Sequence, residues 1–272
     1  MHRATSSPSC WALGDRSSKG PLKTRQPSWL MNCIRKRDMT VPWTACQSGL
    51  DDPRVSAVLT DIFSLAERND SVVMDHAYSK VATWSTAPTI PQMTELCREA
   101  ALPVRREIGH LLYMLVRMLG ATKVVEFGTS FGASLIYLAA AIRDNGTGCV
   151  VGSELHPTKL SIARENITRA GLSAYVEILE GDARETLGTL SGPIDLVLLD
   201  GWKELYLPVL AILEPKMRSG TVVIADNLSL LPQSYLERVR TPANGYVSIE
   251  LPLGDGIEVS MRLSGTAARR PP

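Results

Sequence analysis

Short runs of β-branched and other apolar residues alternate with stretches of helical periodicity through the middle of the chain. Five such runs are predicted as strands, and they cover Lys123–Phe127, Cys149–Ser153, Val176–Leu179, Leu196–Leu199 and Thr221–Ala225. The helical stretches between them are Ser134–Ile142, Thr158–Ala170 and Leu205–Leu213. This alternation is typical of right-handed βαβ units, in which a parallel sheet carries helices on both faces.

Two more strand-like runs, Val247–Leu251 and Ile257–Leu263, follow the fifth strand and are joined by a turn-rich link. A link this short predicts an antiparallel hairpin. We therefore predict an α/β fold, with a doubly wound, mostly parallel seven-stranded sheet and a C-terminal antiparallel hairpin. Apolar faces that begin at Val55 and Ile108 predict N-terminal helices covering the sheet, and Pro88, Pro91 and Pro103 mark the loops between them.

The first fifty residues differ from the rest of the chain. They carry eight Lys/Arg against two Asp, whereas residues 51–272 carry 21 basic and 26 acidic residues. No hydrophobic period is sustained there, so we expect a disordered basic leader over 1–50 and one domain over 51–272, with a short disordered end from about 265. The leader's composition loosely fits an organellar transit peptide. It fits equally well an upstream stretch that precedes a translation start at Met31 or Met39.

Composition excludes several classes of protein. With 29 Lys/Arg and 28 Asp/Glu and no long apolar stretch, the chain resembles neither a membrane span nor a basic nucleic-acid binder. Beyond the leader only Cys97 and Cys149 occur, without metal-ligand spacing, which favours a reducing, cytoplasmic setting over a disulfide scaffold. The oligomeric state stays open, with a homodimer as one option.

A glycine-rich turn and two acids follow the first three strands, at the edge where doubly wound sheets bind ligands. Gly128 and Gly132 let the backbone approach a ligand closely, and the helix behind them offers free amides. Their GxxxG spacing differs from the GxGxxG of dinucleotide folds, which favours a nucleoside or amino-acid pocket. Glu154 is placed to accept hydrogen bonds from two ribose hydroxyls, and Asp182 from an adenine amine.

Acidic and amide side chains also close the fourth and fifth strands, as Asp200 and as Asp226-Asn227. If these strands are neighbours, three oxygen ligands converge, and such a set suits a hard divalent cation such as Mg²⁺. Lys203 is placed to remove a proton from a substrate hydroxyl. Asp200 and Lys203 can instead form a surface ion pair, but that interpretation leaves Asp226-Asn227 unexplained.

These motifs together resemble the catechol O-methyltransferase family. The residues that carry the resemblance are Val124–Gly128 with Gly132 and Ser134, Glu154, Leu199–Lys203 with Tyr206-Leu207-Pro208, and Ala225-Asp226-Asn227. The whole of about 51–263 resembles bacterial S-adenosylmethionine-dependent O-methyltransferases of this type. The resemblance implies a Rossmann-like class I methyltransferase fold. It also implies Mg²⁺-dependent methyl transfer to a hydroxyl of a small catechol-like or hydroxylated natural-product acceptor, without a nucleic-acid or membrane partner.

The resemblance assigns roles by matching position. Metal ligation falls to Asp200, Asp226 and Asn227, and general base catalysis to Lys203. Cofactor contacts fall to eight residues, with Glu126 and Ser134 at the methionine part: Val104, Glu126, Gly128, Gly132, Ser134, Glu154, Asp182 and Asp200. The family's acid that holds the second acceptor hydroxyl lies in the hairpin region, where Glu250 is the nearest candidate for a substrate contact and Asp255 the second. Apart from the resemblance, Trp202 is a substrate candidate as an apolar wall for a flat ring, although packing is the commoner role of a Trp. Gly201 departs from the family, since catechol enzymes carry His there and gain an aromatic contact near the adenine.

Two other functions stay open at this point. An NAD-dependent oxidoreductase shares strand-end acids and a glycine loop, but it is expected to show GxGxxG and has no need of the Asp-x-x-Lys and Asp-Asn motifs. A non-catalytic cofactor-binding relative would share the fold without the chemistry.

Overall fold

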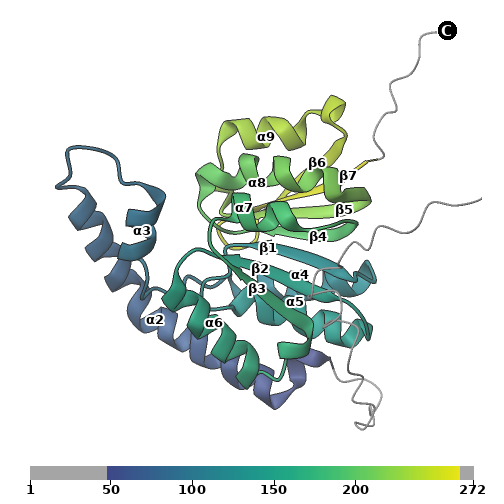
Figure 1. Cartoon of the computed structure of the whole chain (residues 1–272), viewed down its shortest axis with the longest axis horizontal. Helices are drawn as coiled ribbons and strands as arrows, with labels where there is room; N and C mark the ends of the chain where they lie inside the picture. Colours follow the sequence, from purple (N-terminus) through teal and green to yellow (C-terminus); the bar gives the residue numbers. More distant parts are fainter. Residues whose placement is uncertain (1–47, 264–272) are drawn as a thin grey trace, which may run out of the picture.

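The computed structural model describes residues 48–263 and contains the predicted sheet. Its seven strands lie in the order β3-β2-β1-β4-β5-β7-β6 (Figure 1). Their bounds are β1 Lys123–Phe127, β2 Cys149–Glu154, β3 Val176–Glu180, β4 Ile194–Leu199, β5 Met217–Asp226, β6 Tyr246–Leu251 and β7 Ile257–Arg262. The first five strands run parallel, and β7 pairs antiparallel with both β5 and β6. The α/β prediction with a terminal hairpin is therefore confirmed.

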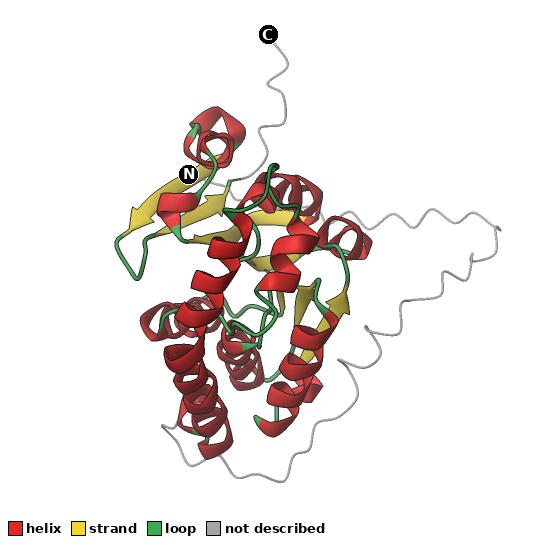
Figure 2. Ribbon diagram, turned by 90° about the vertical axis from the view of Figure 1, so that its left-hand side faces the viewer, coloured by secondary structure: helices red, strands yellow, loops and turns green. Residues whose placement is uncertain are grey.

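Helices cover both faces of the sheet, as Figure 2 shows in the view turned by 90°. One face carries α2 (Pro53–Val81), α4 (Arg106–Met118), α5 (Ala133–Asn145) and α6 (Pro157–Arg169). The other carries α7 (Ala183–Thr186), α8 (Tyr206–Leu213) and α9 (Gln233–Arg240). Because both faces are covered, β1, β2 and β4 are buried along their whole length and consist mostly of apolar residues.

A short helix, α3 (Ile90–Leu96), occupies a stretch that we predicted as a loop from its prolines. Pro91 lies in the first turn of this helix, where a missing amide hydrogen costs nothing. Thr89 and Gln92 cap the same turn reciprocally, since Gln92 N donates to the Thr89 hydroxyl and Thr89 N to the Gln92 side chain. Helix α9 likewise lies in a stretch for which we predicted no helix.

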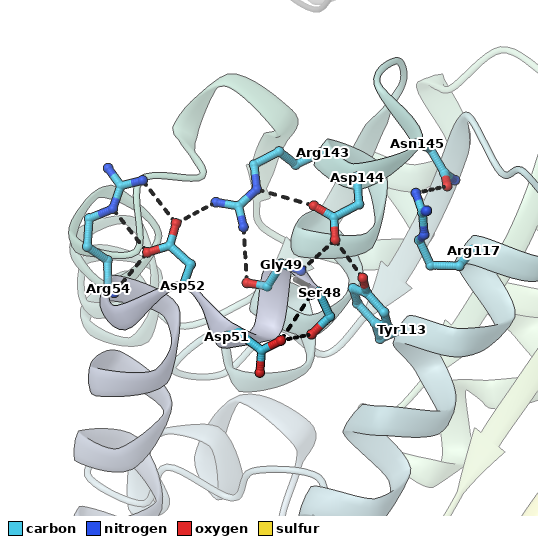
Figure 3. A network of polar contacts seen from close by, with 10 residues as sticks. All are labelled: Ser48, Gly49, Asp51, Asp52, Arg54, Tyr113, Arg117, Arg143, Asp144 and Asn145. Atoms are coloured by element: carbon cyan, nitrogen blue, oxygen red, sulfur yellow. Dashed lines mark hydrogen bonds and ion pairs between the residues drawn. The ribbon is translucent and has the colours of Figure 1, made fainter. Parts of the chain in front are cut away.

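The described part of the chain begins with hydrogen bonds that join Gly49 and Asp52 to Arg143 and Asp144 of α5, which Figure 3 shows and which we call the latch. Gly49 N donates to Asp144 at 2.6 Å, and Arg143 donates to Gly49 O at 3.0 Å and to Asp52 at 2.9 Å. Ser48, Gly49 and Leu50, which we assigned to the leader, thus lie within the described fold. The rest of the predicted leader, and the predicted disordered end, lie outside the described residues. Within 48–263, no helix is both long and apolar enough to cross a membrane.

Candidate active site

A cavity of about 500 Å³ opens at the carboxyl ends of the central strands, under α3. It lies where the strand order reverses between β1 and β4, which is the usual ligand site of such sheets. Eight predicted site residues line it: Gly128, Glu154, Asp182, Asp200, Trp202, Lys203, Asp226 and Asn227. The structure thus brings the two predicted groups, on the cofactor side and on the chemical side, into one cavity.

The glycine turn after β1 packs against the end of β4. Gly128 has φ +97°, and a Cβ there would lie 2.5 Å from the backbone oxygen of Asp200. Glycine is therefore required at this position both by conformation and by the close approach. Gly132, with φ +89°, precedes α5 and turns the chain into that helix.

Glu126 is fully buried and only partly hydrogen bonded. Its Oε2 accepts from the Thr129 hydroxyl at 2.8 Å, whereas Oε1 has no hydrogen-bond partner among residues 48–263. Burial raises the pKa of this carboxyl to about 7, against the lowering effect of the Ser134 and Thr129 hydroxyls. A buried acid with a free oxygen fits a cationic group of a ligand, because such a group would supply the missing partner.

Glu154 and Asp182 lie at the ends of β2 and β3, as predicted. Glu154 accepts from Ser130 N at 2.7 Å and from His156 N at 2.8 Å, so the backbone holds both of its oxygens toward the cavity side of the sheet. Asp182 caps α7 and pairs with Arg184, whose guanidinium lowers the pKa of the carboxyl. Each Glu154 oxygen keeps a lone pair for a ligand hydroxyl, whereas both Asp182 oxygens already accept two hydrogen bonds from Arg184.

The carboxylate of Asp200, which is 12% exposed, and that of buried Asp226 lie near one lysine. Lys203 Nζ lies 3.5 Å from Asp200 Oδ1. Burial raises the pKa of Asp200 to about 8; Lys203 opposes this effect and the negative charge of Asp226 adds to it. Burial also raises the pKa of Asp226. One ammonium group does not balance two desolvated carboxylates, so a further cation would stabilise the pair.

The donor set at this place is made of oxygens. Asn227 follows Asp226 with φ +60°, a left-handed conformation that Asn tolerates better than most residues, and it lines the cavity. Among residues 48–263 no group of three or more His, Cys, Asp and Glu side chains could hold a metal ion, so a third protein ligand here would be the Asn227 amide. Two carboxylates and an amide oxygen fit Mg²⁺ with room for water or substrate oxygens.

Tyr206, for which we predicted no separate role, holds Lys203 in place. Lys203 Nζ donates to the Tyr206 hydroxyl at 2.6 Å, and that hydroxyl donates to the Asp226 carbonyl oxygen at 3.3 Å. The ring is fully buried and packs edge-on against Phe127 and Tyr235. The i, i+3 spacing of Lys203 and Tyr206 in a helical turn is the sequence signal that could have indicated this contact.

Two aromatic residues shape the cavity wall. Trp202 Nε1 donates to the Thr94 hydroxyl of α3 at 2.8 Å and so ties this helix to the loop after β4. Phe127 fills the place of a side chain at 201, since a Cβ on Gly201 would lie 2.4 Å from its ring. The glycine that departs from the catechol enzymes is thus explained by a ring on the neighbouring strand.

Other predicted site residues lie away from the cavity surface. Val104, Ser134 and Glu126 are buried, and neither they nor Gly132 are among the residues that line the cavity. Glu250, the first candidate for the substrate acid, does not line the cavity. It is exposed on the edge strand β6 and pairs with Arg240 at 3.2 Å. Asp255, the second candidate, does line the cavity and pairs with Arg105 at 3.4 Å.

Comparisons with known proteins show which proteins this chain is similar to. A family model described as a methyltransferase domain matches residues 125–228. A catechol O-methyltransferase of Mycobacterium tuberculosis is 36% identical over 128 residues, which cover 47% of this chain and 57% of the relative. One from Niastella koreensis is 30% identical over 162 residues, which cover 57% of this chain and 72% of the relative. The crystal structure of an O-methyltransferase from Bacillus cereus in complex with SAH covers 76% of this chain and 99% of its own, with 21% identity and a TM-score of 0.52, and shares the fold.

Proposed function

Because the chain belongs to the catechol O-methyltransferase family of S-adenosylmethionine-dependent O-methyltransferases, we propose that it methylates a hydroxyl of a small catechol-like or hydroxylated natural-product acceptor with Mg²⁺ bound. The observation that carries the proposal is the group of Asp200, Asp226, Asn227 and Lys203 in one cavity. The chain spans 57% and 72% of the two relatives named above, so the acceptor and the metal dependence belong to the proposal.

On the cofactor side, the proposal assigns each strand-end acid a separate task. Glu126 offers its unpartnered oxygen to the ammonium group of the methionine part, and Glu154 accepts from the ribose hydroxyls. Asp182 is assigned to the adenine amine. S-adenosylmethionine, once bound, supplies the electrophilic methyl group. The negative potential of the buried acids favours this cationic form over its neutral product, which assists release after transfer.

On the chemical side, Asp200, Asp226 and Asn227 would hold Mg²⁺, which lowers the pKa of an acceptor hydroxyl. Lys203 then accepts the hydroxyl proton at Nζ, and the acceptor oxygen forms a bond to the methyl carbon as the carbon–sulfur bond breaks. The products are the methyl ether and S-adenosylhomocysteine, and the proton stays on Lys203 until solvent removes it. Tyr206 and Asp200 orient Nζ for this transfer.

The acceptor side of the cavity combines a flat wall with a charged rim. Trp202, fixed by its bond to Thr94, suits stacking on an aromatic ring. Asp255 takes the place that Glu250 was expected to hold, as the acid near a second acceptor hydroxyl. A vicinal diphenol would present one hydroxyl to Lys203 and the other toward this rim.

Product analysis tests the proposal. The protein is incubated with S-adenosylmethionine, Mg²⁺ and a panel of vicinal diphenols and hydroxylated natural products, and the mixtures are analysed by mass spectrometry. We expect a mono-methylated product that forms with S-adenosylmethionine and does not form when NAD replaces it. Binding of NAD in equilibrium dialysis, with none of labelled S-adenosylmethionine, would refute the proposal in favour of an oxidoreductase. Cofactor binding without any product would favour a non-catalytic relative.

A further inference from the structure

Three residues other than glycine have positive φ within 48–263, and all three line the cavity. They are Leu102 at +42°, Ser130 at +48° and Asn227 at +60°. Asn tolerates this conformation, whereas for Leu and Ser it costs on the order of 1–3 kcal/mol each. Leu102 is also 41% exposed, so packing does not repay its strain. Strain that persists without a packing benefit points to a functional constraint.

Asp70, in the middle of α2, holds the strained backbone at Leu102. Its Oδ1 accepts from Ala101 N at 2.8 Å and its Oδ2 from Leu102 N at 2.7 Å. Two successive amides aimed at one carboxylate form a nest, a conformation that a single anion can stabilise. The anion here is a side chain of the covering helix, so α2 determines the backbone conformation of the segment before α4.

The same segment is held from its other side by the glycine turn. Ser130 Oγ donates to Ala101 O at 2.8 Å and accepts from Lys159 Nζ at 3.0 Å. Lys159 is only 6% exposed in this place. Ser130 N donates to Glu154, the proposed ribose ligand. We call Asp70, Ser130 and Lys159 the loop clamp.

We propose that Asp70 is a positioning residue for cofactor binding: through the loop clamp it keeps Leu102 in its strained conformation in the cavity wall and keeps Ser130 against Glu154. This inference rests on the proposed function and deepens it, because it adds a residue of α2 that touches neither cofactor nor acceptor. Without Asp70, the segment relaxes to negative φ at Leu102. The Ala101 carbonyl then turns away from Ser130, and the cavity loses its preformed shape.

The expected effect follows from the strain. In Asp70→Ala, Leu102 relaxes and must return to positive φ when the ligand binds. The free energy of this strain is then lost from binding, and the affinity for S-adenosylhomocysteine should fall roughly 5- to 100-fold. Asn69 offers a matched control, since it lies next to Asp70 on α2 and donates to the Glu99 carbonyl of the same segment at 2.8 Å, away from the strained residue. Asn69→Ala should change the affinity less than about twofold.

A double-mutant cycle tests the mechanism. Isothermal titration with S-adenosylhomocysteine compares the full-length chain with Asp70→Ala, Leu102→Gly and the double variant. Glycine adopts positive φ without strain, so removing Asp70 should cost much less in the Leu102→Gly background than in the wild type. If Asp70 merely stabilises α2, its removal costs the same factor in both backgrounds, and that result would overturn the inference.

Two further outcomes are decisive. If Asp70→Ala does not fold by circular dichroism, Asp70→Asn, which keeps one acceptor oxygen, replaces it in the same cycle. A wild-type protein that binds no S-adenosylhomocysteine would refute the proposed function and this role with it. A wild type that binds, together with an Asp70 variant of unchanged affinity, would refute the role alone.

Discussion

The side chains of Lys203 and Tyr206 form a hydrogen bond of 2.6 Å inside the cavity, and the Tyr206 hydroxyl continues it to the Asp226 carbonyl oxygen. The proposed base is thereby joined to the backbone of a proposed metal ligand through one buried ring. Lysine has a long, flexible side chain, so this contact and the Asp200 carboxylate together define where Nζ lies. Catalysis by positioning depends on such contacts.

Replacing Tyr206 by Phe should reduce kcat by up to about tenfold, since loss of this hydrogen bond costs roughly 0.5–1.5 kcal/mol and frees Nζ to move. The affinity for S-adenosylhomocysteine should stay within about twofold. Tyr235→Phe is the matched control, because Tyr235 is equally buried and its hydroxyl has no hydrogen-bond partner among the described residues. Steady-state rates of both variants check this, and equal losses would contradict the positioning role.

Gly201 and Phe127 should be energetically coupled. A Cβ on Gly201 would lie 2.4 Å from the Phe127 ring, so Gly201→Ala should destabilise the protein by about 1–3 kcal/mol through overpacking. In a Phe127→Leu background the same change should cost much less. Urea unfolding of the four proteins measures the coupling. Gly188→Ala, whose Cβ would have its nearest neighbour at 3.9 Å, should be close to neutral.

Glu126 should lower the stability of the free protein and strengthen its binding of the cofactor. Its pKa is raised to about 7 in the fold, against about 4.5 in the unfolded chain, so the wild type loses stability as the pH rises between these two values. Glu126→Gln removes this loss. The variant should match the wild type in stability below about pH 4.5 and exceed it above pH 7, by about 3 kcal/mol at most.

The same substitution should weaken binding of S-adenosylmethionine, because an amide does not balance the charge of the ammonium group. Thermal unfolding from pH 4 to 8, together with calorimetric titration, checks both effects. A Glu126→Gln protein less stable than the wild type at pH 8 would show that this carboxylate has a partner in the free protein.

The latch at Asp52 should make the fold acid-sensitive. Burial alone would raise the pKa of Asp52, but hydrogen bonds from Arg54 and Arg143 outweigh it and hold the pKa at about 2. The contribution of Asp52 to stability is therefore complete above its unfolded pKa near 4 and is lost as the pH falls to about 2. Asp52→Asn should lower the free energy of unfolding by roughly 1–3 kcal/mol at pH 7.

At pH 2, where Asp52 is about half protonated in the fold, the difference between Asp52→Asn and the wild type should be much smaller than at pH 7. Chemical denaturation across this range measures it, with Asp51→Asn as a control because the Asp51 residue is exposed and bonds only to the neighbouring Ser48. A difference that persists unchanged at pH 2 would contradict the low pKa of Asp52.

Much of the fold could be predicted because strands that are buried on both faces of the sheet are rich in apolar residues. Lys123–Phe127 is predicted and observed with the same bounds, since every residue of this central strand is buried. Asp200 and Asp226 could be placed together because parallel neighbouring strands bring their carboxyl ends to one edge. Exposure weakens such signals, and the eight-residue α9, with a short apolar stripe, was missed.

Contacts between distant segments could not be predicted. Asp70 reaches the amides of Ala101 and Leu102 across about thirty residues, and backbone donors leave no pattern in a sequence. Glu250 and Asp255 are both acids of the hairpin region, and only the position of β6 at the sheet edge shows that the first points away from the cavity. The sequence indicated that Gly201 removes an aromatic contact, whereas in the structure the Phe127 ring occupies the space of a side chain at position 201.

The central claim is metal-dependent methyl transfer at the Asp200, Asp226 and Asn227 site with Lys203 as the base. The most direct measurement is the rate of transfer from labelled S-adenosylmethionine to a vicinal diphenol, with Mg²⁺ and with excess EDTA, in the wild type, Asp226→Ala and Lys203→Ala. We expect transfer that requires Mg²⁺ in the wild type, none in Asp226→Ala, and a rate about 10²- to 10⁴-fold lower in Lys203→Ala. Full activity in EDTA, or full turnover by Lys203→Ala at neutral pH, would contradict the account.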